Sequence, residues 1–269
     1  MQFGLIIIGD EILSGKRSDK HLEKAIALFN ARGLQVSYAN YVGDDPQRIT
    51  ATLKIAFSSG DVVFSFGGIG ATPDDHTRQC AAGALDVALA LHPQAKALIL
   101  ERMQDIAKEQ GHTFEPERPD NIHRLNMGHF PLGAGIIPNP YNKIAGFSCT
   151  APAGGTIHFL PGFPVMAWPM LEWVLDTQYA QWFRHKRWLE KSVIVMGAME
   201  ASLTPLMESI EREFDAKVFS LPSVDHAVYG RHIELGVKGS PEIVESAFGA
   251  LKHGLQNFAV ELGPELVRT

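Results

Sequence analysis

The sequence predicts an α/β protein with a parallel, doubly wound sheet, followed by a small α+β domain. Strand and helix patterns alternate through the first ninety or so residues, and the first strand pattern is an unbroken apolar run. A second mixed pattern begins near residue 191. Successive β-α-β crossovers are right-handed almost without exception, so this order gives a parallel sheet with helices on both faces.

The first two predicted strands are separated by one helix. Residues 5–8 form a continuous apolar run, which is typical of a strand buried on both faces of a parallel sheet. A helix follows near Asp19, with apolar residues at helical spacing. These residues are Leu22, Ala25, Ile26 and Phe29. Gly33 then permits a left-handed stop, and residues 35–42 form the second strand.

The next helix begins at a recognisable cap. Asp45 is a favoured N-cap residue and Pro46 suits the first helical turn. Residues 62–66 form the third strand. From about 111 to 155 the pattern dissolves into Pro, Gly and Asn, which predicts loops or short edge strands, and residues 157–160 restore a strand.

A helix after Pro164 is predicted to carry all four tryptophans. They are Trp168, Trp173, Trp182 and Trp188. Such a stripe most often indicates packing in a core or between domains, and a dimer face is the alternative.

The chain after residue 190 predicts a βαββα unit. Its strands are expected at 193–196, 217–221 and 229–237, with helices over 203–214 and from Ser240 onward. We therefore divide the chain into a domain of residues 1–185 and a small α+β domain of residues 186–269.

Composition excludes several classes of protein. The 269 residues carry 24 Lys and Arg against 30 Asp and Glu, which argues against a nucleic-acid binder. Cys80 and Cys149 form no C-x-x-C pair, so neither a zinc thiolate site nor a disulfide framework is indicated. No segment reaches the roughly 20 apolar residues of a membrane span, and no signal peptide is evident. We expect a soluble, cytoplasmic protein without a membrane partner.

The loops after the three strands collect acidic residues and glycines. They are Gly9-Asp10-Glu11, Gly43-Asp44-Asp45 and Gly67-Gly68-Ile69-Gly70-Ala71-Thr72-Pro73-Asp74-Asp75. The ligand crevice of an open α/β sheet lies beyond the carboxyl ends of its strands. The sequence therefore predicts a binding site with six carboxylates and a glycine-rich turn.

The third loop has the form of a phosphate-binding turn. Gly67, Gly68 and Gly70 would let backbone N–H groups face an anion, and a helix predicted to start at Thr72 would direct its positive end there. Alternatively, Thr72 and Asp75 form only a helix cap. Three glycines favour a ligand, because a cap needs at most one.

Carboxylates this close to a phosphate would repel it, and a divalent cation would resolve the conflict. Oxygen ligands without a zinc-spaced set of histidines or thiolates favour Mg²⁺ or a similar hard ion, and phosphoanhydride rather than acyl chemistry. The segment Gly9–Gly15 is not a P-loop, since five residues separate its glycines. His76 adjoins Asp75, and Asn121, His123 and Asn126 are candidates for lining a pocket.

These motifs resemble the molybdopterin-binding (MoaB/Mog-like) domain of CinA-type competence/damage-inducible proteins. The resemblance extends over residues 9–15, 42–45, 67–77 and 160–164. It implies a three-layer α/β/α fold with a mostly parallel sheet, often in a homo-oligomer. The tail after residue 190 resembles the small α+β domain that follows in these proteins, and we expect the chain to lack their C-terminal amidase domain.

The resemblance also implies a function and roles for residues. CinA-type members are associated with metal-dependent cleavage of ADP-ribose-like pyrophosphates, and a related domain accompanies FAD synthases. We therefore expect a metal-dependent nucleotide pyrophosphatase that uses Mg²⁺ or a similar divalent cation. The alternatives are a non-catalytic binder of molybdopterin or a nucleotide, and a scaffold.

Each role is carried over to a position in this sequence. The expected catalytic residues are Asp74, Asp75 and Asp10, with Asp74 and Asp75 as metal ligands. The expected ligand-binding residues are Gly67, Gly68, Gly70, Thr72, Gly9, Glu11 and Asp44. The expected partner is a small-molecule nucleotide or pterin.

Overall fold

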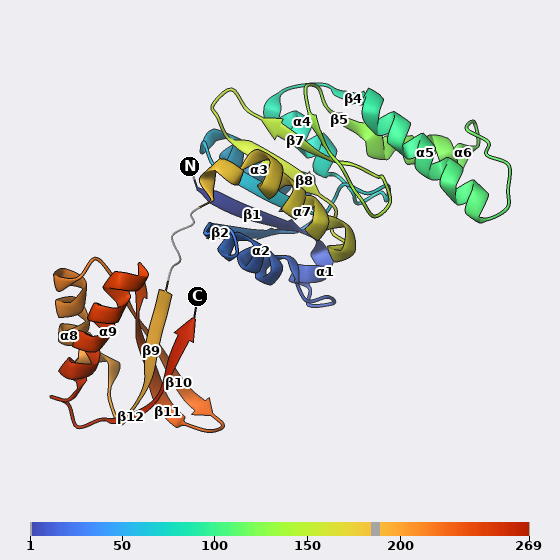
Figure 1. The fold of residues 1–269 in the computed structure, drawn as a ribbon. Coiled ribbons are helices and arrows are strands. Elements are labelled where there is room, and N and C mark those ends of the chain that lie inside the picture. Colours follow the sequence, from blue (N-terminus) through green and yellow to red (C-terminus); the bar gives the residue numbers. More distant parts are fainter. Residues whose placement is uncertain (1, 184–188, 269) are drawn as a thin grey trace. The chain divides into compact units, whose positions relative to one another are not determined.

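The computed structural model describes residues 2–183 and 189–268, which form two compact units divided between Phe183 and Arg184 (Figure 1). Each unit has its own sheet and its own hydrophobic core. Trp188, one of the four tryptophans, lies outside the described residues. Within the described residues, no helix is both long enough and apolar enough to cross a membrane.

The N-terminal unit is built on a six-stranded sheet. Its strands, in spatial order, are β2 (Val36–Val42), β1 (Phe3–Ile8), β3 (Val62–Phe66), β8 (Thr156–Leu160), β7 (Gly146–Thr150) and β6 (Gly135–Ile137). The first four are parallel to one another, and β7 is antiparallel to both of its neighbours, β8 and β6. The predicted mostly parallel sheet is therefore confirmed.

Helices cover both faces of this sheet and give the three layers of the predicted fold (Figure 1). They are α2 (His21–Asn30) and α7 (Pro164–Gln178) on one face, and α3 (Pro46–Ser58) and α4 (Thr77–Leu85) on the other. Leu5 and Ile7 of β1 belong to the core with α2 and α7, and Ile6 and Ile8 to the core with α3 and α4. The unbroken apolar run arises because successive side chains of a strand point to opposite faces.

The predicted helix boundaries around β2 are confirmed. The Asp45 carboxylate caps α3 by accepting the Arg48 N–H at 2.7 Å, and Pro46 occupies the first turn. After α2, Gly33 adopts a φ of 67°. A short helix that the sequence did not predict, α1 (Asp10–Leu13), follows β1 directly.

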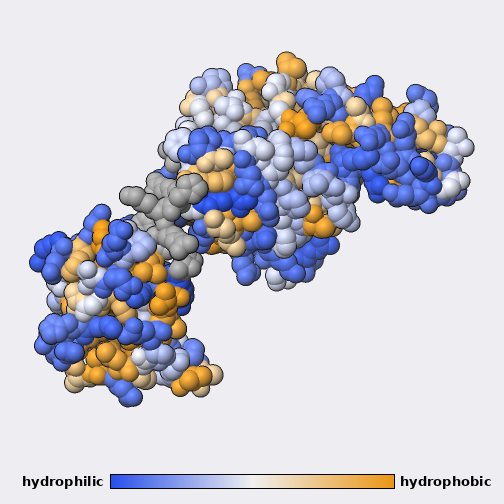
Figure 2. Space-filling model, in the orientation of Figure 1, coloured by the Kyte–Doolittle hydropathy of each residue, from blue (hydrophilic) through white to orange (hydrophobic). Residues whose placement is uncertain are grey.

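The segment 111–155 holds more regular structure than the predicted loops and short edge strands. β4 (Leu89–Leu91) and α5 (Pro93–Glu109) precede this segment. The segment itself contains α6 (Pro119–Arg124), the 3₁₀ helix η1 (Leu125–Gly128) and β5 (His129–Pro131), followed by β6 and β7. β5 pairs antiparallel with β4. Such short elements give too few repeats for a periodic pattern. In Figure 2, hydrophilic residues cover much of the surface formed by α5 and α6.

The tryptophans do not share one helix. α7 carries Trp168 and Trp173, and Trp182 lies in the following 3₁₀ helix, η2 (Ala180–Trp182). Trp168 packs against the core with α2 and α7, as the packing interpretation requires. Trp182 is instead half exposed.

The C-terminal unit is a four-stranded antiparallel sheet with two helices on one face (Figure 1). Its elements are β9 (Leu189–Met196), α8 (Glu200–Glu213), β10 (Lys217–His226), β11 (Gly230–Gly239), α9 (Pro241–Leu255) and β12 (Glu261–Arg268). The predicted βαββα unit therefore lacked its last strand. β12 contains Gly263 and Pro264, and its pairing with β9 shifts register between Leu262 and Glu265. Gly and Pro inside a strand obscure its pattern.

Candidate functional site

The loops after β1, β2 and β3 meet at one edge of the N-terminal sheet. The Gly9 N–H donates to the Val42 carbonyl at 3.0 Å, which joins the ends of β1 and β2. A Cβ placed on Gly67 would stand 2.3 Å from the Ile8 carbonyl oxygen, so the loop after β3 packs directly on the end of β1. The structure therefore brings together the three segments that the sequence singled out.

The loop after β8 joins the same edge. Its Gly162 carbonyl contacts the Nε2 of His21 at 3.0 Å, and the His21 ring stacks on Phe66 of β3. Burial lowers the pKa of His21. A Cβ on Gly162 would lie 3.5 Å from the Cα of Gly67. His21 was not among the predicted site residues, because its helix position marks it only as part of α2.

Asp10 and Asp44 lie next to each other at this edge of the sheet. The Asp44 carboxylate accepts the Asp10 N–H at 2.9 Å, and the Asp10 carboxylate accepts the Asp44 N–H at 3.1 Å. Desolvation raises the pKa of Asp44, and the charges of Asp10, Glu11 and Asp74 raise it further, against the opposing hydrogen bond from the Asp10 N–H. Four of the six predicted carboxylates therefore form one acidic cluster.

The glycine-rich loop after β3 is shaped by its own contacts. Gly67 and Gly68 have φ values of 101° and 68°, which favour glycine. Thr77 fixes both, since its hydroxyl donates to the Gly67 carbonyl at 3.1 Å and its N–H to the Gly68 carbonyl at 3.0 Å. The Gly67 N–H is already bonded to the Leu160 carbonyl at 3.0 Å. Gly67 therefore shapes the turn and leaves its N–H unavailable to a ligand.

The rest of the loop has backbone donors to spare. Among residues 2–183 and 189–268, no acceptor bonds the N–H groups of Gly68, Ile69, Gly70 or Ala71. Consecutive N–H groups in a turn of this kind form a concave anion-binding surface. This part of the predicted phosphate cradle is consistent with the observed hydrogen bonding.

The helix predicted to begin at Thr72 begins instead at Thr77, so that prediction was wrong. Thr72 and Asp75 close a turn before it: the Asp75 carboxylate accepts the Thr72 N–H at 2.8 Å and its hydroxyl at 2.6 Å. The Asp75 N–H donates back to the Thr72 carbonyl at 3.0 Å. One oxygen of Asp75 is thus committed to ordering the loop.

Asp74 and Asp75 stay predicted metal ligands, and the chemistry of the nearby side chains bears on which ion would fit. Among the described residues, no group of three or more His, Cys, Asp or Glu side chains is placed to hold a metal. A closed zinc site is therefore not formed by these residues. Mg²⁺, by contrast, is usually bound through one or two carboxylates, several waters and the phosphates of a substrate. The acidic cluster fits that second pattern.

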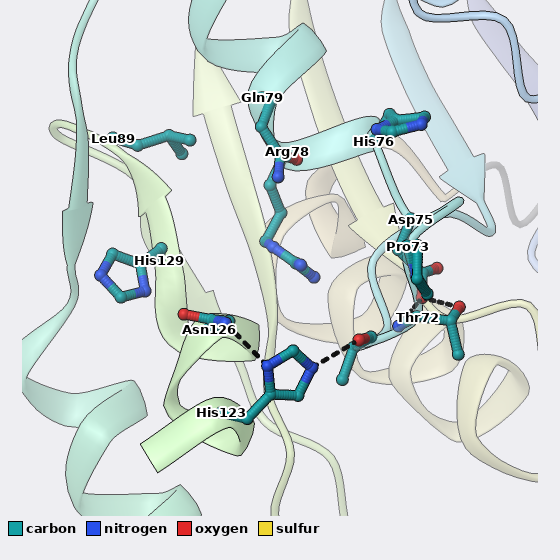
Figure 3. A pocket seen from close by; sticks show the side chains of 11 residues that line it. Thr72, Pro73, Asp75, His76, Arg78, Gln79, Leu89, His123, Asn126 and His129 are labelled. Atoms are coloured by element: carbon teal, nitrogen blue, oxygen red, sulfur yellow. Dashed lines mark hydrogen bonds between the residues drawn. The ribbon is translucent and has the colours of Figure 1, made fainter. Parts of the chain in front are cut away.

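A cavity of about 550 Å³ lies beside the glycine-rich loop (Figure 3). Of the predicted site residues, Thr72 and Asp75 line it. His123 and Asn126, candidates from the sequence, line it as well, whereas Asn121 is buried and bonds the Glu115 carbonyl at 2.7 Å. The cavity thus joins the loop to the segment formed by α6, η1 and β5.

His123 connects that segment to the loop. Its Nε2 lies 3.0 Å from the Ala71 carbonyl, and the Asn126 amide nitrogen lies 3.4 Å from its Nδ1 (Figure 3). The Ala71 carbonyl can only accept a hydrogen bond, so Nε2 of His123 is the donor in this contact. His123 therefore positions the loop.

Sequence reasoning missed Arg78 and His129 in this cavity. Arg78 is 4% exposed and donates through Nη1 to the Ile69 carbonyl. Burial lowers its pKa. The available signal was an arginine in the first helical turn after the predicted phosphate-binding loop, which is unusual because positive charge is disfavoured at a helix N-terminus.

Comparison with known proteins connects this geometry to a family. Residues 4–181 match the family described as a probable molybdopterin binding domain. A putative competence-damage inducible protein of Alkaliphilus metalliredigens is 33% identical over 175 residues, covering 64% of this chain and 39% of that protein. The aligned part of the chain thus spans about two fifths of that relative's length.

Two further comparisons cover different extents of the chain. A protein of Caldivirga maquilingensis is 28% identical over 262 residues, 95% of each chain. A crystal structure of the protein CinA, with unknown function, from Thermoplasma acidophilum has a TM-score of 0.54 and 27% identity, covering 65% of this chain and 96% of that one. The resemblance to CinA-type proteins that the motifs predicted is therefore confirmed.

Proposed function

Because this chain belongs to the family of probable molybdopterin-binding domains, we propose that it binds a phosphate-bearing pterin or nucleotide on the loop after β3. One observation carries the proposal: the N–H groups of Gly68, Ile69, Gly70 and Ala71 have no acceptor among the described residues. Backbone N–H groups presented in this way bind phosphate without any cationic side chain.

The acidic cluster calls for a cation beside the phosphate. The charges of Asp10, Glu11 and Asp74 lie near enough to Asp44 to add to the rise in its pKa that desolvation causes. A phosphate placed there would add more negative charge. Mg²⁺ would be held by Asp10, Asp44 or Asp74 together with the ligand's phosphate oxygens, and would neutralise charge on the phosphoanhydride.

Hydrolysis of a pyrophosphate such as ADP-ribose is the second candidate, favoured by Asp44. A partly desolvated carboxylate with a raised pKa is suited to accept a proton from water. The water oxygen would form a bond to one phosphorus while the anhydride P–O bond breaks. ADP-ribose and water would then give AMP and ribose 5-phosphate.

Ligand-dependent unfolding tests the binding proposal. A ligand that binds only the folded state raises its stability, by about 2.7 kcal/mol when its concentration is one hundred times Kd. We expect nucleotides or pterins with phosphate groups to raise Tm in the presence of Mg²⁺, and their dephosphorylated forms to have no effect. Equal shifts with both forms would contradict phosphate recognition.

Product analysis separates the enzyme from the binder. Purified protein is incubated with ADP-ribose or FAD and a divalent cation, and AMP is measured. AMP formation that stops with EDTA supports hydrolysis. A rise in Tm without AMP under any metal supports a non-catalytic molybdopterin or nucleotide binder.

A further inference from the structure

The cavity beside the loop contains a buried positive charge that no carboxylate neutralises by contact. Arg78 makes no ion pair with any carboxylate in the part of the chain that the structure describes. Buried arginines are normally paired, because an unpaired buried charge carries a large desolvation cost. Among the residues that the structure describes, the Arg78 guanidinium makes one hydrogen bond, to the Ile69 carbonyl, which uses one of its five N–H donors.

The surroundings of Arg78 add donors and leave space. The Arg78 side chain runs from α4 toward the 71–75 loop, with the His123 ring and Asn126 across the cavity (Figure 3). His76 and His129 line the same cavity, and no hydrogen-bond partner is recorded for either ring among the described residues. The cavity volume of about 550 Å³ lies within the range of small-molecule pockets.

The charged group nearest in this wall is Asp75. Its carboxylate faces Thr72, whose N–H and hydroxyl both donate to one of its oxygens. It attracts Arg78 through space, but the two side chains do not form a contact pair. The N-terminal end of α4, whose Arg78 and Gln79 line the cavity, contributes further positive potential.

We propose that this cavity is an anion-binding site, in which Arg78, assisted by His129 and His76, binds the phosphate group of a nucleotide-sized small molecule. The inference goes beyond the proposed function, because its donors are cationic side chains and it needs no metal. The two sites share the loop after β3: the N–H groups of residues 68–71 belong to the first site, and Thr72 and Asp75 lie in the wall of the second.

Binding of inorganic phosphate and AMP in the presence of EDTA tests the proposal, measured by isothermal titration calorimetry on the full chain. Chelation removes the metal-dependent contribution to binding, so the remaining binding that is lost in Arg78→Gln reports the cavity. We expect both probes to bind at millimolar concentration or below, and adenosine not to bind. Arg78→Gln should weaken binding about tenfold or more, since it removes charge-assisted hydrogen bonds. Arg78→Lys should restore part of it.

Arg102→Gln is the matched control. Arg102 of α5 pairs with Glu109 at 3.0 Å and does not line the cavity. Phosphate affinity should be unchanged in this variant. Equal loss in both variants would overturn the proposal, as would binding that is insensitive to Arg78→Gln or no binding by wild type.

A second measurement covers the case in which Arg78→Gln does not fold. Ring-proton signals of His129 and His76, assigned with His129→Asn and His76→Asn variants, are followed by NMR during phosphate titration of the wild type in EDTA. We expect both signals to shift with saturation. Signals that stay fixed, while calorimetry shows binding, would place phosphate elsewhere. AMP-dependent stabilisation that requires Mg²⁺ and Asp44 would then support the proposed function alone.

Discussion

Asp10 and Asp44 hold each other's backbone: each carboxylate accepts the other's N–H, at distances of 3.1 and 2.9 Å. This exchange joins the end of β1 to the end of β2 without any cation. It also places two carboxylates side by side, close to Glu11 and Asp74. The hydrogen bonds of this pair therefore stabilise the two loops, while the negative charges of its carboxylates repel each other.

Asp44→Asn should separate these two effects. Its amide oxygen can still accept the Asp10 N–H, while the charge is lost. A raised folded-state pKa means that the charged form is disfavoured in the fold, so neutralisation should leave stability unchanged or slightly higher in urea unfolding. Mg²⁺-dependent ligand stabilisation should fall. Asp61→Asn, remote from this edge, serves as the control, and an equal loss of ligand binding there would contradict the assignment.

Gly68→Ala should destabilise the protein and abolish binding to the loop. Its φ of 68° is unfavourable for alanine, and the new Cβ would stand 2.1 Å from the Thr77 hydroxyl. We expect a loss of about 1 to 3 kcal/mol in unfolding free energy. Gly83→Ala, in α4 with open space around its Cβ position, should instead stabilise by about 0.5 to 1 kcal/mol.

Thr77→Val tests the anchor of the glycine-rich loop. Valine keeps the shape but removes the hydroxyl that donates to the Gly67 carbonyl. A buried carbonyl left without this donor costs about 1 to 3 kcal/mol, measurable by urea denaturation. Thr177→Val removes an exposed hydroxyl bonded to the Trp173 carbonyl in α7 and should change stability by less than about 0.5 kcal/mol. Similar losses in both variants would show that loop anchoring is not the cause.

The stability of the N-terminal unit should decline with acid in a window set by His158. This ring is fully buried between Ser148 and Tyr179, at 2.7 Å from each hydroxyl, and burial lowers its pKa to about 3 from 6.5. The unfolded chain therefore binds the proton first as pH falls. The contribution of the neutral His158 ring to stability is complete above pH 6.5 and is lost progressively toward pH 3. The free energy of unfolding then falls by at most about 1.4 kcal/mol per pH unit.

His158→Gln provides the comparison for that window. Glutamine does not titrate and keeps a polar group between the two hydroxyls. Urea denaturation of this variant at several pH values should show a shallower decline than wild type. Parallel curves would assign the acid sensitivity to other groups.

The sequence predicted the parts of the fold that local physics specifies. The apolar run of β1 is readable because both faces of the strand are buried, and Asp45 is readable because a cap acts within three residues. β12 was missed because its partner strand β9 lies far away in sequence and because Gly263 and Pro264 interrupt its own pattern. Thr72 was misread for a related reason: the same residues close a turn or cap a helix, and only the contacts of Thr77 decide between them.

The candidate site was predictable to a similar degree. The carboxylates of Asp10 and Asp44 follow from the topology of a parallel sheet, which brings strand ends together. Arg78 was not predictable as a cavity residue, since its burial depends on α6, η1 and β5 folding over the loop. The arginine in the first turn of α4 is a local signal, but it does not reveal this long-range packing.

The turn closed by Thr72 and Asp75 is built entirely from the chain's own atoms. A loop that already has its binding conformation loses little conformational entropy when a ligand binds. Association with this loop should consequently proceed in a single concentration-dependent phase, with encounter rather than rearrangement setting its speed.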